Sequence, residues 1–424
     1  MLLRSGRLRK ASTGSRKICW KLRIAKMSNR ILCTIIAKNY LAFARTLAQS
    51  FLSQYSDGKV YVLIVDDFEG YINPADECFE TVGLAELKIP KLPEFCFKYS
   101  LKELCTAAKA SFLEHLICDR RCESVIYLDP DVLITGSLDQ LYENLDNHDI
   151  ILTPHLDTDY PDDGLMPDDG HILRAGQFNL GFIGINCSAN ARAFLRWWKS
   201  KLYEHCVVDV PNGYFVDQKF IDFVPFFFGR VLIEKDTGYN VGYWNLHSRR
   251  LKQTDGSWGC NEGPLYFFHF SGYDPDGSAI SRHIPESVAR YRFANRCDLT
   301  NLFTEYKHLL LQNGHSEARL WPYSFDCFNT GERVPEQLRV YYRNLPSAKR
   351  AGNPFDSEEL KQRVDLYSRS AARLALQGEA TAAAQLDAIL NSRAWRWVSR
   401  YGRFKNRYLT RATERFGRFF GSTK

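Results

Sequence analysis

The first half of the chain alternates short apolar runs with longer stretches that have helical spacing. Apolar residues recur every three to four positions over residues 41–51 and 100–118, which predicts helices. The intervening apolar runs are short and rich in β-branched residues, which predicts buried strands; they cover residues 31–36, 61–65, 124–128 and 150–152. Strands that alternate with helices form mainly parallel sheets with helices on both faces. The pattern therefore predicts an α/β fold of the Rossmann-like kind.

Two of these predicted strands end in paired acidic residues. Asp66 and Asp67 follow the second run, and Asp129 and Asp131 flank Pro130 after the third. Ligands of open parallel sheets collect at the carboxyl ends of the strands. We therefore expect a binding site that these acidic residues border.

The later regions are less regular. A glycine-punctuated strand is expected over 178–186 and an amphipathic helix over 191–203. Beyond about residue 300 the alternation fades, and residues 354–420 are helical in composition. We divide the chain into a basic, flexible leader (1–29), an α/β domain (30–300), an accessory region (301–353) and a helical extension (354–424).

The formal charge of +7 is unevenly distributed. Residues 1–30 hold ten Lys or Arg and no acid, and residues 393–424 hold ten with one acid, Glu414. The 36 basic and 48 acidic residues between them give the body a charge of −12, which argues against a nucleic-acid groove and favours an enzyme whose ends attach to an anionic surface. The twelve cysteines lack the paired spacing of a zinc site, which favours a reducing compartment. No apolar run has the length of a signal peptide or a spanning helix.

The Asp129-Pro130-Asp131 turn suits a hard divalent cation. Magnesium and manganese prefer oxygen ligands, and such a cation stabilises the charge that develops on a departing diphosphate. Pro130 cannot donate a ladder hydrogen bond, so it ends the strand and fixes the turn. Acidic turns after strands are common by themselves. The apolar runs on both sides, 125–128 and 132–134, favour the site over an ordinary turn.

The segment Ile126–Ile134 resembles the DxD segment of GT-A fold glycosyltransferases, particularly those of glycosyltransferase family 8. Further similar segments follow in the same order over about residues 31–275: Cys33–Tyr40, Val65–Asp67, Glu103–Lys109, Phe178–Phe182, Val216–Gln218 and Phe268–Gly272. The resemblance implies a GT-A domain over 30–300 that transfers a sugar from a nucleotide-sugar donor, with UDP-sugar favoured and the anomeric configuration retained. One departure is that Tyr273-Asp274-Pro275 stands where such enzymes carry a lysine, which leaves the neutralisation of the diphosphate unassigned.

The resemblance also implies residue roles. Asp129, Asp131 and His269 would hold Mn²⁺ or Mg²⁺, and Asp217 and Gln218 would face the transferred sugar as the catalytic pair. The nucleotide-sugar would contact Thr34, Ala37, Asp66, Asp67, Lys109, Asp129, Asn179 and Gly181. Structural alternatives stay open: His269 as a core histidine, Lys109 as a solvated helix residue, and Asp217 with Gln218 as a helix N-terminus.

The C-terminal segment has two neighbouring helical stripes. One holds arginines from Arg393 to Arg418, and the other holds aromatic residues from Trp397 to Phe419. Such a helix suits an anionic membrane surface; docking onto the acidic body and nucleic-acid binding are the alternatives. Residues 390–396 also resemble a tail of bacterial cell-surface polysaccharide glycosyltransferases. That likeness favours a glycan or lipid-linked glycan acceptor. Together with the cysteine spacing and the charge distribution, we expect a cytoplasmic enzyme on the inner face of the cell membrane, without a nucleic-acid partner. Residues 360–374 keep helical spacing that could form a hairpin or a homodimer contact.

Two other functions compete with sugar transfer. A sugar nucleotidyltransferase would need a glycine-rich, basic loop after the first strand to hold a triphosphate, and Ala37–Tyr40 is not one. A non-catalytic sugar-binding or membrane-associated protein with a degenerate site would bind no nucleotide in the presence of manganese.

Overall fold

The computed structural model describes residues 30–346, 349–350 and 352–364. The predicted leader and the arginine-aromatic tail therefore lie outside the described residues. The chain divides into two compact units, Met1–Ile89 with Leu101–Tyr323, and Pro90–Ser100 with Ser324–Lys424. No helix of the described residues combines the length and the apolar character that crossing a membrane requires.

The first unit is built on a seven-stranded sheet with the order β10-β6-β7-β4-β1-β2-β3. β1 pairs in parallel with β2 and β4, β2 with β3, and β6 with β10, whereas β7 runs antiparallel to both of its neighbours. The strands are β1 (Ile31–Ile36), β2 (Lys59–Ile64), β3 (Glu80–Gly83), β4 (Ser124–Leu128), β6 (Ile150–Leu152), β7 (Phe182–Asn186) and β10 (Val231–Ile233). The predicted α/β fold with a mainly parallel sheet is confirmed.

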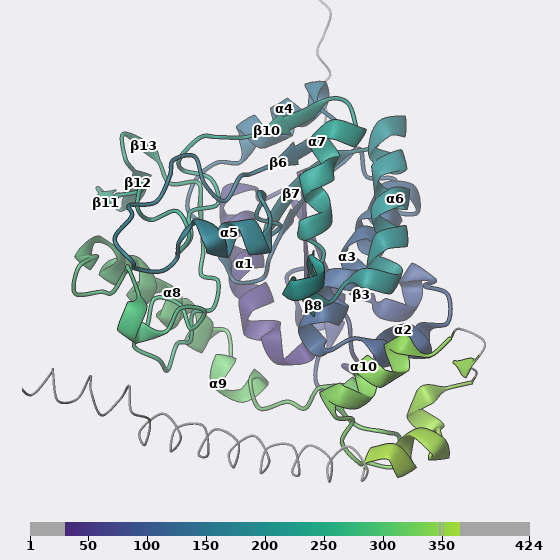
Figure 1. Ribbon diagram of the computed structural model, residues 1–424. Helices are drawn as coiled ribbons and strands as arrows, with labels where there is room; N and C mark the ends of the chain where they lie inside the picture. Colours follow the sequence, from purple (N-terminus) through teal and green to yellow (C-terminus); the bar gives the residue numbers. More distant parts are fainter. Residues whose placement is uncertain (1–29, 347–348, 351, 365–424) are drawn as a thin grey trace, which may run out of the picture. The chain divides into compact units, whose positions relative to one another are not determined.

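Helices accompany the sheet (Figure 1). They are α1 (Leu41–Gln54), α3 (Leu101–Cys118), α4 (Asp139–Asn147), α5 (Asp169–Ala175), α6 (Ala189–His205), α7 (Val224–Phe227), α8 (Thr300–Gln312) and α9 (His315–Ala318). Short strands complete the unit: β5 (Val132–Ile134), β8 (Val208–Asp209), β9 (Tyr214–Phe215), β11 (Leu251–Thr254), β12 (Ser257–Cys260), β13 (Gly263–Pro264) and β14 (Phe267–His269).

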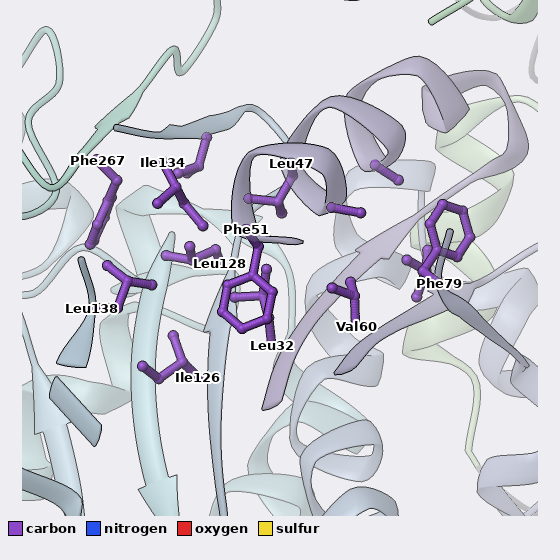
Figure 2. Close-up of a cluster of buried hydrophobic side chains, with 14 of the residues drawn as sticks. Leu32, Leu47, Phe51, Val60, Phe79, Ile126, Leu128, Ile134, Leu138 and Phe267 are labelled. Atoms are coloured by element: carbon purple, nitrogen blue, oxygen red, sulfur yellow. The ribbon is translucent and has the colours of Figure 1, made fainter. Parts of the chain in front are cut away.

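Both faces of the central strands are covered, which explains why their sequences are apolar throughout rather than alternating. All six residues of β1 are buried. Figure 2 shows one face, where Leu47 and Phe51 of α1 lie over Leu32, Ile126 and Leu128. On the opposite face, Lys109 of α3 places its ammonium group 4.3 Å from the centre of the Tyr127 ring. Lys109, on this second face, is one of the predicted site residues.

The second unit contains α2 (Leu92–Lys98) and α10 (Glu336–Asn344). Arg339 of α10 is buried and donates hydrogen bonds to the carbonyls of Phe97 (2.8 Å) and Tyr99 (3.0 Å). The Phe97 ring packs edge-on against Tyr342 and Phe355. One buried arginine therefore joins two segments that are about 240 residues apart.

Candidate functional site

Two strand pairings bring the acidic turn and His269 together. β4 ends at Leu128, and the Asp129 amide donates to the Gly181 carbonyl at 2.9 Å. β5 then pairs antiparallel with β14, so that His269 lies opposite Val132. The Nε2 atom of His269 is 3.1 Å from Oδ1 of Asp131 and 3.8 Å from Oδ2 of Asp129. The strand pairing thus brings together residues that are about 140 positions apart in the sequence.

This triad fits a divalent cation. One donor atom from each of Asp129, Asp131 and His269 lies within 4.8 Å of the others. Donor atoms that share one small cation at about 2.1 Å lie roughly 3 Å apart, which is close to the spacing of the imidazole and the Asp131 carboxylate. Two carboxylates and an imidazole are ligands that Mn²⁺ accepts.

The charge state of the triad agrees with this interpretation. Burial opposes ionisation, yet the neighbouring imidazole lowers the pKa of Asp131. In turn, burial favours neutral His269, but Asp131 raises the pKa of the imidazole above its ordinary value. Asp131 and His269 therefore form a charged pair. A bound cation would displace the proton that the imidazole carries in this pair.

Gly181 is required for the position of His269. A Cβ atom at position 181 would lie 2.2 Å from Cε1 and 2.4 Å from Nδ1 of His269, and 2.8 Å from Oδ1 of Asn179. Cβ atoms in proteins essentially never lie closer than 3.0 Å to such neighbouring atoms. The hydrogen atom of glycine is therefore what allows the imidazole to reach the carboxylates.

Lys109 links the triad to Asp217. Its ammonium group is 2.7 Å from Oδ2 of Asp217 and 3.6 Å from Oδ1 of Asp129, and it donates to the Leu180 carbonyl at 2.8 Å. Burial lowers the pKa of Lys109, but Asp217 and Asp129 outweigh burial and raise it above the ordinary value. Lys109 is therefore a buried, charged residue, and the alternative of a solvated helix lysine is wrong.

Asn179 and Gln218 fix the loop before β7. Asn179 Oδ1 accepts from the Gly181 amide (3.0 Å) and from the Asn240 side chain (3.1 Å). Gln218 Oε1 accepts from the Leu180 amide (3.0 Å), and its Nε2 donates to the carbonyl of Ala175 (3.0 Å). Both amide side chains thus hold the backbone beside His269, and their predicted contact with the sugar stays a prediction.

His155 completes this network as a neutral imidazole. Its Nδ1 donates to the Gly176 carbonyl at 2.9 Å, and its Nε2 accepts from Nδ2 of Asn179 at 3.1 Å. Burial is the main reason that the pKa of His155 is lowered to about 4. A proton on Nε2 would also face the amide donor of Asn179, so the neutral form is the one that the network accepts.

We expect His155 to make the fold sensitive to acid. Below its ordinary pKa of about 6.5, the unfolded chain binds a proton that the folded protein excludes down to about pH 4. Stability is therefore lost as the pH falls through this window, by about 2 kcal/mol between pH 7 and pH 4.5. Urea unfolding at both pH values checks this, because His155→Gln should show a smaller loss than the natural protein. Equal losses in the two proteins would contradict the assignment.

Two hollows meet at the triad. The larger cleft, about 610 Å³, is lined by residues 35–37 at and just after the end of β1, by Asp129–Asp131 and by the segment 271–275. The smaller pocket, about 320 Å³, is lined by several of the predicted site residues: Lys109, Asn179, Gly181, Asp217 and Gln218. Asp129 and His269 border both. The arrangement can hold an extended ligand whose central, charged part lies at the triad.

Three predicted nucleotide contacts lie apart from these walls. Thr34 is fully buried within β1. Asp66 accepts from the backbone amide and the ammonium group of Lys38, each at 2.9 Å, in a buried ion pair. Asp67 lines a separate surface hollow formed by residues 67–74. Their roles in binding a nucleotide stay predictions.

Sequence reasoning missed several supporting residues. The Tyr127 hydroxyl donates to Oδ1 of Asp129 at 2.6 Å. Tyr127 lies two residues before Asp129, so its side chain is expected on the same side of the chain, which is a usable local signal. Trp244 packs edge-on against His269, with ring centroids 5.1 Å apart. Trp244 and Asn240 have no local signal, because they lie more than 20 residues from any motif in the sequence.

No protein-family model matches the chain. Two uncharacterized proteins of Bacillus subtilis (strain 168) are each 26% identical: YfnD over 252 residues (58% of this chain, 79% of YfnD), and YfnF over 245 residues (57% and 80%).

Three solved structures that resemble this chain are glycosyltransferases. The galactosyltransferase LgtC matches 66% of this chain and 95% of its own, with 18% identity and a TM-score of 0.39. GlyE of Streptococcus pneumoniae TIGR4 matches 71% and 66%, with 16% identity and a TM-score of 0.39. The bifunctional WbbM matches 68% and 52%, with 13% identity and a TM-score of 0.38.

Proposed function

We propose that this protein is a metal-dependent GT-A glycosyltransferase. It would move a sugar from a nucleotide-diphosphate sugar, with UDP-sugar favoured, to a glycan or lipid-linked glycan acceptor. The observation that carries the proposal is the cluster of Asp129, Asp131 and His269, of which Asp129 and His269 border both hollows. The larger cleft would take the nucleoside, the border the diphosphate, and the smaller pocket the transferred sugar.

The residues of the smaller pocket suit the chemistry at the anomeric carbon. When the bond to the diphosphate breaks, positive charge develops on the sugar, and a carboxylate fixed nearby stabilises it. Asp217 is buried in the wall of this pocket and is held by Lys109 at 2.7 Å. Asp217 and Gln218 are thus the proposed catalytic pair, with retention of configuration expected from the family 8 likeness.

The triad is the proposed binding site for the cation that contacts the leaving group. Asp129, Asp131 and His269 would hold a Mn²⁺ or Mg²⁺ ion, which when bound neutralises charge on the departing diphosphate. Tyr127 and Lys109 both contact Oδ1 of Asp129 and so fix one carboxylate oxygen away from the one that faces His269. The chain's own contribution is therefore positional: it fixes the donor atoms before the ligand arrives.

Thermal unfolding with a panel of nucleoside diphosphates tests this proposal. UDP with Mn²⁺, each near 100 times its dissociation constant, should raise the melting temperature by roughly 5 °C, because it binds only the folded state. UDP with EDTA, or Mn²⁺ with uridine, should produce a much smaller shift. An equal shift for UDP with and without the metal would overturn the metal-dependent site, and no shift with UDP, GDP or ADP would overturn the proposed function.

A further inference from the structure

The larger cleft contains cations that no carboxylate neutralises. Among the described residues that line it, the lysine and arginine side chains are Lys102, Arg282 and Arg319. Arg319 forms an ion pair with Asp276. Within the part of the chain that the structure describes, Lys102 and Arg282 form no ion pair. Their charges are thus available to a ligand in the cleft.

The proposed site needs such a charge. Asp129 and Asp131 together balance a divalent cation, and Lys109 balances Asp217. A nucleoside diphosphate would then enter a site with no net charge to offset its own phosphates. Because anions in a partly enclosed cleft are stabilised by adjacent cations, an additional basic residue beside the triad is required.

The backbone holds Arg282 against the segment that carries His269. The Arg282 amide donates to the Gly272 carbonyl at 2.9 Å. Gly272 has a φ of +72°, and a Cβ atom there would lie 2.6 Å from both Oγ of Ser281 and Cδ2 of His283. A glycine at 272 therefore lets the segment 281–283 pack closely against the chain three residues after His269.

Tyr40 shares the larger cleft with Arg282 and the triad. Arg282, Tyr40 and Asp131 all line the larger cleft. Burial and the adjacent Asp131 raise the pKa of Tyr40, while Arg282 acts in the opposite direction. Tyr40 itself is fixed by stacking on Phe43, with ring centroids 4.5 Å apart. Because Arg282 lines the cleft with the triad and its amide donates to the Gly272 carbonyl, it lies on the side of the cleft where the diphosphate is expected.

We propose that Arg282 binds the terminal phosphate of the leaving nucleoside diphosphate. This inference rests on the proposed function. It assigns a cation to neutralise the diphosphate, a role left unassigned because Tyr273-Asp274-Pro275 stands where similar enzymes carry a lysine. Lys102 is the weaker candidate because it lines both hollows and places its ammonium group 5.4 Å from the centre of the Phe215 ring. The planar guanidinium of arginine also matches two phosphate oxygens, which a lysine ammonium does not.

Calorimetric titration with UDP and with UMP, both in the presence of Mn²⁺, tests the assignment. Arg282→Ala should weaken UDP binding by about 10- to 100-fold, the usual effect of losing charge-assisted hydrogen bonds, and UMP binding by less than about threefold. Arg282→Lys should recover part of the UDP affinity. Arg292→Ala is the matched control, since Arg292 is exposed and lies outside the cleft. Binding of Mn²⁺ alone should be the same in all four proteins, which verifies that the triad is intact.

The outcomes separate this inference from the proposed function. If the natural protein binds no nucleoside diphosphate, the proposed function fails, and this inference with it. If the natural protein binds UDP and Arg282→Ala binds it equally well, this inference alone is overturned. It is also overturned if Arg282→Ala weakens UMP and UDP equally, or if Lys102→Ala and not Arg282→Ala causes the loss.

Discussion

Replacing Asp131 with alanine is expected to abolish manganese binding and sugar transfer. The Asp131 carboxylate is the triad oxygen nearest the imidazole, 3.1 Å from Nε2 of His269. Its loss removes a charged ligand and leaves a buried imidazole without its main ionic partner. We expect Mn²⁺ affinity to fall by more than about 100-fold, and transfer to fall on the order of 1000-fold as several kcal/mol of leaving-group stabilisation disappear.

Isothermal titration with MnCl₂ measures the first effect without any assumption about donor or acceptor. Asp146→Ala is the matched control, because Asp146 is an exposed acid on α4 that lines neither hollow. This control should bind manganese like the natural protein. If Asp131→Ala keeps its manganese affinity within about threefold, the assigned ligand set is wrong.

Gly181→Ala is expected to act almost as strongly, although alanine supplies no ligand and removes none. The added methyl group would overlap the imidazole of His269 and the amide oxygen of Asn179. Either His269 or the loop before β7 must move, which costs about 1–3 kcal/mol of stability and withdraws Nε2 from the carboxylates. Manganese affinity should drop by on the order of tenfold or more, with a lower melting temperature.

Gly184→Ala provides a matched comparison on the same stretch of chain. A Cβ atom at position 184 would meet Ile151 and Leu145 at 3.4–3.6 Å, within ordinary contact distance. This variant should bind manganese normally and lose little stability. The same loss of manganese affinity in both variants would mean that the effect comes from general disturbance of β7 and not from the displacement of His269.

The sheet and the acidic turn could be predicted because their signals are local. Fully buried strands read as continuous apolar runs, and the Asp129-Pro130-Asp131 turn follows directly from the end of one of them. The role of Gly181 could not be derived in this way, because the steric conflict involves a residue 88 positions later in the chain. The antiparallel pairing of β5 with β14 is equally non-local.

Asp66 shows the limit of the same local rule. Like Asp129, it follows a buried strand at the carboxyl edge of the sheet, and the sequence pattern treats the two alike. The structure separates them: Lys38 binds Asp66 in a buried pair, whereas Asp129 faces both hollows. The difference depends on a lysine 28 residues earlier, whose partner no local pattern identifies.

A crystal structure of the protein soaked with MnCl₂ and UDP, with data collected at a wavelength that excites manganese, tests the central claim most directly. The account predicts an anomalous peak about 2.0–2.3 Å from oxygens of Asp129 and Asp131 and from Nε2 of His269, with phosphate oxygens completing the coordination. Manganese bound elsewhere, or UDP bound with no anomalous peak between these three side chains, would contradict it.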